Sequence, residues 1–173
     1  MEYVVLVNEL DVEQGTMEKI QAHREGRLHR AISVFIFNSR GEMLLQQRAA
    51  GKYHSSLLWT NACCSHPRHH ESMYDAAVRR LREEMGIACE LQKIFTFLYK
   101  ARLDNELTEH ELDHVFTGIS DDAPLPDPAE VAAWRYIKMD DLDAEIAGNP
   151  AAFTEWFKIC LRDWREELSA TIS

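Results

Sequence analysis

Several common features are missing from this sequence of 173 residues. No apolar run approaches the roughly 20 residues of a membrane-spanning helix, and the N-terminus lacks the basic-then-apolar pattern of a secretory signal. We therefore expect a cytoplasmic protein. Four cysteines, two of them adjacent (Cys63 and Cys64), are too few and too badly spaced for a disulfide framework. Without internal repeats or a Gly/Ser linker, residues 1–173 are expected to form one domain.

Basic residues are also in deficit, with 19 Lys and Arg against 29 Asp and Glu and a formal net charge of −10. Nucleic acids and anionic membranes are polyanions, so we expect neither as a partner. The charge is nevertheless uneven along the chain. Residues 18–52 carry a net +4, residues 104–113 carry −5, and residues 121–147 carry −6. The basic stretch suits a small anionic ligand, and the last stretch is expected to be a solvated face.

Hydrophobic patterning predicts strands interleaved with helices. The expected strands are residues 3–8, 29–37, 42–48, 94–98, 114–118 and 134–138. A helix is expected over 70–85 with Gly86 at its C-terminal cap, and a final helix from Asn149-Pro150. Because the two element types do not alternate strictly, we expect an α+β fold, a mixed sheet flanked by helices in an α/β/α sandwich.

The segment from Ser65 to Ile87 carries acids at a recognisable spacing. The positions that match are Glu71, Arg79, Glu83, Glu84 and Gly86. This pattern resembles the Nudix box, in which a loop, a helix and a second loop carry acids to a metal-bound diphosphate. Ser65 replaces the first glycine of that box, and Arg80 replaces one glutamate. Metal-assisted hydrolysis needs dense carboxylates, so a phosphate-binding cation at this position favours diphosphate binding over hydrolysis. An ordinary ion pair between Arg80 and Glu84 is the alternative.

The run WTNACCSHP at residues 59–67 stands directly before this box. Together the two resemble the type 1 isopentenyl-diphosphate delta-isomerases, and further matches extend the resemblance from about residue 3 to about residue 160. It implies a Nudix-like fold. It also implies conversion of isopentenyl diphosphate to dimethylallyl diphosphate in isoprenoid biosynthesis, by protonation and deprotonation through a tertiary carbocation.

The resemblance also implies a set of site residues. The catalytic group comprises Cys64, Glu111, Tyr99 and Trp156. One divalent metal ion, Mn²⁺ or Zn²⁺, is expected on His23, His29, His66, Glu109 and Glu111. A Mg²⁺ ion bound with the substrate diphosphate corresponds to Glu84. The diphosphate itself is expected on Lys19, Arg48, Lys52 and Arg80. Glu111, supported by Tyr99, is expected on the protonating side and Cys64 on the abstracting side.

The residues alone give these roles uneven support. On a strand, Glu109 and Glu111 point to one face, and a divalent cation would relieve their repulsion; a solvated acidic turn is the alternative. Tyr99 and Trp156 fit core packing as well as catalysis. Cys63 and Cys64 would point in opposite directions in an extended segment, so only one faces the site. A vicinal disulfide or a zinc site remains possible for this pair. No role is assigned to His54, His69, His70, His110 or His114.

Two other functions remain open on this reasoning. The first is a Nudix diphosphohydrolase that uses Glu83 and Glu84 on a nucleoside diphosphate derivative. The second is a catalytically silent module that binds metal or diphosphate. The apolar stripes are explained by a core, so the sequence is compatible with a monomer or a homodimer.

Overall fold

A nine-stranded mixed sheet forms the centre of the structure, a computed structural model that describes residues 1–172. The strands are β1 (Tyr3–Val7), β2 (Glu13–Glu18), β3 (His29–Phe37), β4 (Met43–Arg48), β5 (Trp59–Thr60), β6 (Cys63–Ser65), β7 (Gln92–Arg102), β8 (Thr108–Ile119) and β9 (Val131–Ile137). Strands β3 and β8 run parallel, whereas β3 is antiparallel to β1, β4 and β6. The mixed sheet confirms the expected α+β class.

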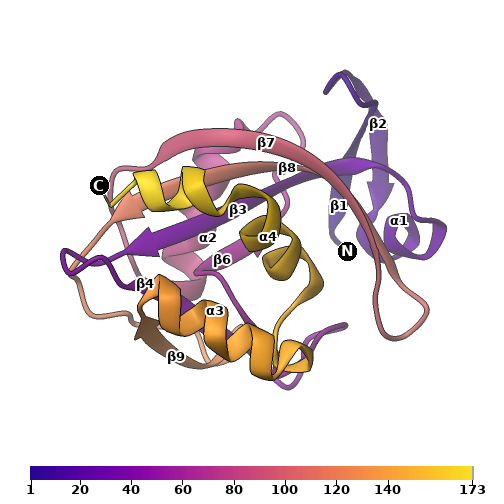
Figure 1. The fold of residues 1–173 in the computed structure, drawn as a ribbon. Coiled ribbons are helices and arrows are strands. Elements are labelled where there is room, and N and C mark those ends of the chain that lie inside the picture. The colour runs from indigo at the N-terminus through magenta and orange to yellow at the C-terminus, as the bar shows by residue number, and fades with distance from the viewer. Residues whose placement is uncertain (173) are drawn as a thin grey trace.

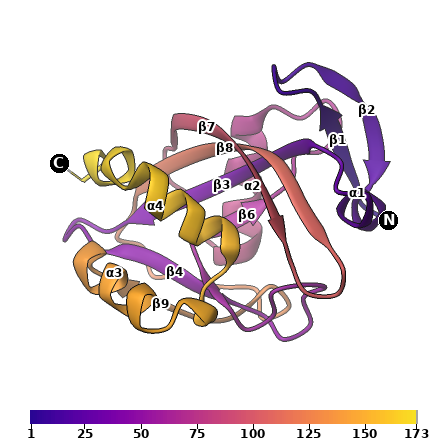
Figure 2. The ribbon, with the colours of Figure 1, turned by 45° about the vertical axis from the view of Figure 1, so that its right-hand side comes forward.

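Helices cover both faces of this sheet. They are α1 (Lys19–Glu25), α2 (Met73–Met85), α3 (Met139–Gly148), a short 3₁₀ helix (Pro150–Ala152) and α4 (Glu155–Ala170). In Figure 1, α3 and α4 lie in front of the sheet and α2 lies behind it. Figure 2 shows α1 beside β1 and β2, at the end of the sheet away from the C-terminus. No helix within residues 1–172 has the length and apolarity needed to cross a membrane.

The alternation of side chains along β3 explains the two layers. Phe35 and Phe37 pack with α3 and α4 in one buried cluster, whereas Ile32, Val34 and Ile36 pack against α2 in another. Successive strand residues point to opposite faces, so a strand with a continuous apolar run, such as residues 34–37 here, is buried on both sides. The run HRAISVFIF therefore forms a central strand.

Helix α2 carries the box of acids between well-defined ends. Ser72 caps its first turn by accepting the N–H of Asp75, and Gly86 ends it in the left-handed conformation with φ +67°. A Cβ at Gly86 would lie 2.7 Å from the carbonyl oxygen of Leu125, so only glycine fits there. In the preceding loop, Glu71 accepts a two-pronged ion pair from Arg79 at 2.6 and 2.8 Å.

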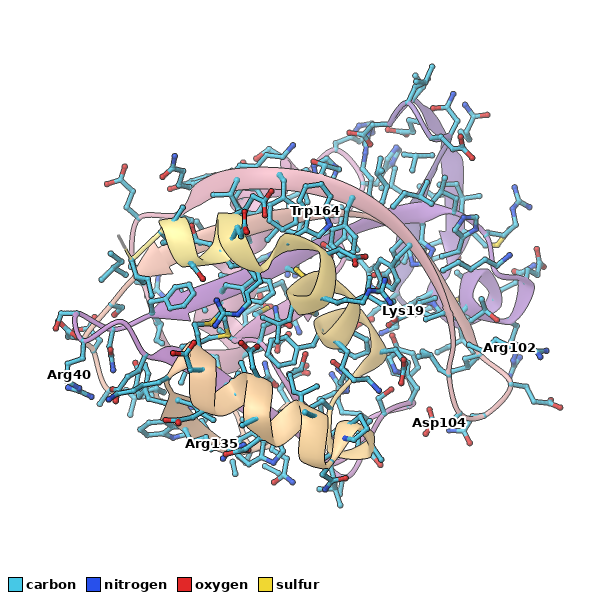
Figure 3. All side chains as sticks on the ribbon, viewed as in Figure 1. Lys19, Arg40, Arg102, Asp104, Arg135 and Trp164 are labelled. Atoms are coloured by element: carbon cyan, nitrogen blue, oxygen red, sulfur yellow. The ribbon has the colours of Figure 1, made fainter. Side chains whose placement is uncertain are left out.

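Several elements differ from the sequence expectations. Strands β2, β5 and β6 and helices α1 and α3 were not expected, and β8 begins at Thr108 rather than near residue 114. The prediction of a helix from Asn149-Pro150 is wrong, because that segment forms the 3₁₀ helix and α4 starts at Glu155. Helix α4 also kinks at Trp164, whose ring stacks on Phe95 of β7 with centroids 4.5 Å apart (Figure 3).

Candidate active site

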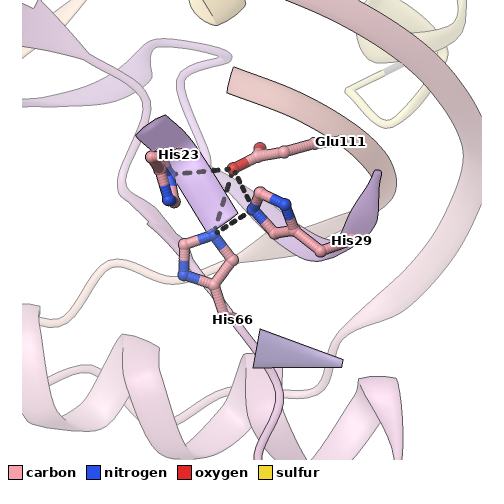
Figure 4. Close-up of side chains that lie close together, drawn as sticks. All are labelled: His23, His29, His66 and Glu111. Atoms are coloured by element: carbon pink, nitrogen blue, oxygen red, sulfur yellow. Dashed lines mark hydrogen bonds and ion pairs between the residues drawn. The ribbon is translucent and has the colours of Figure 1, made fainter. Parts of the chain in front are cut away.

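Three histidines from separate elements converge on one carboxylate. His23 lies on α1, His29 opens β3 and His66 follows β6, and all three approach Glu111 of β8 (Figure 4). Oε1 of Glu111 lies 3.0 Å from Nε2 of His66, 3.4 Å from Nε2 of His29 and 4.0 Å from Nε2 of His23. The Nε2 atoms of His29 and His66 are themselves 3.2 Å apart. These four ligand atoms lie within 4.8 Å of one another.

Hydrogen bonds at the other ring nitrogens orient two of these histidines. Nδ1 of His23 lies 2.7 Å from the carbonyl oxygen of Lys19, and Nδ1 of His29 lies 2.8 Å from that of Arg27. Each Nδ1 donates to a carbonyl, so each Nε2 is left with a lone pair aimed inward, the usual arrangement of metal-binding histidines. Nε2 of His23 is buried without a hydrogen-bond partner in the described part of the chain. The set fits a divalent metal ion.

Sheet register brings Glu111 to this position. His29 of β3 faces Glu111 in the parallel pair, and Tyr99 of β7 faces it in the antiparallel pair. Partners on neighbouring strands point to the same face, so the three side chains form one row across the sheet. The hydroxyl of Tyr99 lies 2.6 Å from Oε2 of Glu111 and 3.0 Å from Oε2 of Glu109, and donates to these carboxylates. Glu109 and Glu111 lie on a buried strand, not in a solvated turn.

The two buried carboxylates have opposite electrostatic environments. Burial and the neighbouring Glu111 carboxylate raise the pKa of Glu109 well above its usual value. Burial alone would raise the pKa of Glu111 as well, but its interactions with the neighbouring imidazoles of His29 and His66 outweigh burial and lower that pKa well below its usual value. Burial lowers the pKa of His23 to about 4, so its imidazole is neutral at pH 7 and able to bind a metal.

Cys64 faces this site and Cys63 faces away. Cys63 is buried in the cluster under α2, whereas Cys64 lines the pockets described below. Sγ of Cys64 lies 3.1 Å from both Oδ1 of Asn61 and Oγ of Ser33, and Ser33 donates in turn to Asp113 at 2.6 Å. Burial, followed by the Asp113 carboxylate, raises the pKa of the Cys64 thiol. All four cysteines are free thiols.

Two connected pockets lie over these residues. The larger, which we call the outer pocket, has a volume of about 340 Å³; the smaller, the inner pocket, has about 30 Å³. All four cations expected to bind diphosphate line the outer pocket: Lys19, Arg48, Lys52 and Arg80. The expected catalytic residues line the inner pocket: Cys64, Tyr99, Glu111 and Trp156. Cys64 and His66 line both. A cationic entrance therefore leads to an inner site with acid and base groups.

Three of the four expected cations of the outer pocket are paired with acids of the chain itself, the exception being Arg48. Lys19 is ion-paired with Glu2, and Lys52 with Glu130. Arg80 contacts Glu130 at 3.3 Å as well. Glu130 was expected on a solvated face, and that expectation is wrong because its carboxylate bridges two cations in the pocket. No motif marks it, since the contact depends on how the loop before β9 folds over the end of α2.

Glu84 lies behind Arg80 rather than on the pocket wall. One of its oxygens accepts from Arg80 at 2.6 Å and the other accepts from Gln46 at 2.9 Å, and the side chain is buried. The ion pair considered from the sequence is therefore present. A Mg²⁺ ion on Glu84 would share this carboxylate with these two donors or displace one of them.

Trp156 and His54 occupy the wall of the inner pocket. Trp156 belongs to the buried cluster of α4 and also lines the pocket, and Cζ of Arg48 lies 5.3 Å from its ring centroid. His54, which sequence patterns left without a role, is buried at 3% exposure, with its ring 5.9 Å from that of Trp156. Its Nε2 approaches Oε1 of Glu109 to 3.7 Å. These contacts in the folded structure, and not its place in the sequence, indicate that His54 belongs to the site.

Comparison with known proteins defines the class of this fold and site. The model of the NUDIX domain matches residues 27–157. A solved structure from Deinococcus radiodurans superposes with a TM-score of 0.78 at 21% identity, covering 95% of this chain and 100% of that one. These findings confirm a Nudix-like fold.

Curated relatives narrow the class further. Isopentenyl-diphosphate Delta-isomerase 1 of Aromatoleum aromaticum is 52% identical over 91% of this chain and 89% of its own length. Isopentenyl-diphosphate Delta-isomerase of Pectobacterium atrosepticum is 52% identical over 90% of this chain and 87% of its own length. The chain belongs to the isopentenyl-diphosphate Delta-isomerase family, which confirms the resemblance identified from the WTNACCSHP motif.

Proposed function

We propose that this chain is an isopentenyl-diphosphate Delta-isomerase that converts isopentenyl diphosphate to dimethylallyl diphosphate, with Cys64 and Glu111 as its proton-transferring residues. The observation that carries the proposal is their meeting in the inner pocket, next to a cationic outer pocket. The relatives at 52% identity, named for this activity, support the substrate and the reaction class.

The two parts of the substrate bind in different pockets. Its diphosphate suits the outer pocket, where Lys19, Lys52 and Arg80 present donors that match phosphate oxygens. Binding there must displace the internal carboxylates that now hold these cations. The five-carbon group then reaches the inner pocket, which at about 30 Å³ must widen to admit it. The loop that carries Tyr53 and His54 forms part of the inner wall.

Moving a double bond requires a proton to be added at one carbon and removed at another. An unactivated alkene is a weak base, so a positioned acid is needed on one side and a base on the other. Glu111, with the Tyr99 hydroxyl 2.6 Å away, is assigned to the protonating side and Cys64 to the abstracting side. The reaction is reversible, and the roles exchange with its direction. The two groups come from β8 and β6, which flank β3.

A tertiary carbocation forms between these two proton transfers. It needs an electron-rich neighbour that does not attack it, and the indole of Trp156 lines the inner pocket. An indole face contributes roughly 0.5–2 kcal/mol of cation–π attraction. Trp156 therefore serves both the helix core and the stabilisation of the cation.

The proposed metal centre consists of His23, His29, His66 and Glu111, joined by Glu109. The convergent Nε2 atoms and the buried, unpartnered nitrogen of His23 support it, and Mn²⁺ or Zn²⁺ suits this donor set. A bound divalent ion would supply positive charge that fixes both carboxylates and relieves their repulsion. Mg²⁺ is assigned to the substrate diphosphate near Glu84.

Hydrolysis of a nucleoside diphosphate derivative fits this arrangement less well. In helix α2, Arg80 stands where the Nudix box has a glutamate, and both oxygens of Glu84 are engaged by Arg80 and Gln46. The density of free carboxylates that metal-assisted hydrolysis requires is therefore absent from the described part of this helix.

The adjacent cysteines provide a matched test. Cys64→Ala should lower kcat/KM for isopentenyl diphosphate by roughly 10²–10⁴-fold, the usual contribution of a general acid or base. Cys63→Ala removes the same thiol from the opposite face of β6 and should retain most of the activity. Isomerisation is followed by the appearance of dimethylallyl diphosphate, and circular dichroism checks folding. Near-normal turnover by a folded Cys64→Ala variant would refute the assignment.

A further inference from the structure

The loop between β4 and β5 holds His54 in an unusual backbone conformation. Ser55 and Leu57 have φ of +49° and +61°, in the left-handed region that costs non-glycine residues on the order of 1 kcal/mol or more. Arg48 holds the loop by donating to the carbonyls of His54 at 3.1 Å and Ser55 at 3.2 Å. Asp104, in the turn between β7 and β8 (Figure 3), accepts the N–H of Ser55 at 3.0 Å.

These contacts turn the His54 ring toward the metal centre. Its Nε2, Nε2 of His23 and Oε1 of Glu109 lie within 4.8 Å of one another. This second group shares only His23 with the group of four around Glu111. The distance from Nε2 of His54 to Oε1 of Glu109 is 3.7 Å. Glu109 thus reaches the centre beside a histidine to which no role was assigned from the sequence.

The other nitrogen of His54 indicates which of them carries the hydrogen. Nδ1 lies 3.1 Å from Oγ of Ser55. When the Ser55 hydroxyl donates to Nδ1, the hydrogen of the neutral ring is on Nε2, which faces the carboxylate of Glu109. Oε2 of Glu109 already accepts from Tyr99 at 3.0 Å. Tyr99 therefore holds Oε2 of this carboxylate by a hydrogen bond, while Nε2 of His54 faces Oε1 at 3.7 Å.

We propose that His54 is a positioning residue of the metal centre, which keeps Oε1 of Glu109 directed toward His23 because its Nε2 edge faces that oxygen. The inference rests on the metal centre of the proposed function and adds a residue to it. Residues that orient a metal-binding group typically change metal affinity by about 10–100-fold when they are lost. On this proposal, the contacts of the loop with Arg48 and Asp104 offset its backbone strain and keep the His54 side chain in the site.

Metal binding tests this role without relying on turnover. The full-length chain is freed of metal with a chelator and titrated with Mn²⁺, and free Mn²⁺ is measured by electron paramagnetic resonance. His54→Ala should weaken binding by about 10–100-fold, whereas His54→Gln should retain most of the affinity because its amide again presents an N–H group to Oε1 of Glu109. His70→Asn is the matched control, since His70 is exposed at φ +65°, a conformation that asparagine tolerates. Circular dichroism confirms that each variant is folded.

A double-mutant comparison separates positioning from general structural support. If His54 acts through Glu109, adding His54→Ala to Glu109→Gln should weaken Mn²⁺ binding no further. Additive losses, equal losses in His54→Gln and His54→Ala, or unchanged affinity in His54→Ala would each overturn the role of His54. Failure of the unmodified chain to bind Mn²⁺ would instead overturn the metal centre of the proposed function, and this inference with it.

Discussion

Replacing Glu130 by glutamine should tighten the binding of diphosphate to the outer pocket. In the structure the Glu130 carboxylate is ion-paired with both Lys52 and Arg80. An incoming diphosphate must break these pairs and also approach a like charge. Glu130→Gln removes both costs while keeping the size of the side chain.

The structure sets the expected size of this effect. The side chains of Glu130, Lys52 and Arg80 are 24%, 20% and 18% exposed, so each ion pair is partly screened by water. Pairs of this kind contribute about 0.2–1 kcal/mol each. Two pairs give about 0.4–2 kcal/mol, which corresponds to roughly 2–30-fold in Kd. The gain should shrink as salt is added, because salt screens exposed charges.

Isothermal titration calorimetry with inorganic diphosphate, in the absence of divalent metal, measures this change directly. Glu166→Gln is the matched control, since it makes the same change of charge at an exposed position on α4. Weaker diphosphate binding by Glu130→Gln would refute the reasoning. So would an equal gain in both variants, because it would reflect net charge rather than competition within the pocket.

Two further predictions concern the buried acids. Tyr99→Phe removes the hydroxyl that donates to Glu109 and Glu111, so kcat should fall by roughly 10²-fold or more with little change in KM, measured with isopentenyl diphosphate under saturating metal. Asp113 should make stability pH-dependent. Burial and Glu111 raise its pKa to about 8 in the folded state, against about 4 when unfolded. Folding therefore takes up a proton between these values, and stability should fall as pH rises from 4 to 8. Asp113→Asn should make the stability of the metal-free protein less dependent on pH between 4 and 8, as measured by thermal denaturation. An unchanged pH dependence in this variant would contradict the raised pKa of Asp113.

Local sequence patterns predicted the helices and strands whose own hydrophobic periodicity or capping residues are clear. The apolar run of β3 and the capped stripe of α2 have clear periodicity, and both form as expected. Strand β2 has the sequence EQGTME, which is mostly exposed and lacks a β pattern, so its pairing with β1 specifies it. The first half of β8, TEHELD, has the composition of a solvated turn. It is buried because its neighbours supply histidine and tyrosine partners for its acids.

The residues of the candidate site likewise fall into those that sequence motifs predicted and those that only the structure shows. The motifs marked Cys64 and the five proposed metal ligands, whose side chains the structure brings close together. They assigned no role to His54 or to Glu130. Both enter the pockets through long-range contacts, His54 with Glu109 and Glu130 with two cations. Pairings between distant segments, such as the parallel register of β3 with β8, have no local signal.

Incubation with isopentenyl diphosphate in deuterated water tests the central claim most directly. Because the proton added to the alkene comes from an exchangeable acid of the inner pocket, the dimethylallyl diphosphate formed should carry deuterium in its new methyl group. Nuclear magnetic resonance or mass spectrometry of the product detects this label. Release of phosphate without an allylic product, or dimethylallyl diphosphate formed with no deuterium, would contradict the account.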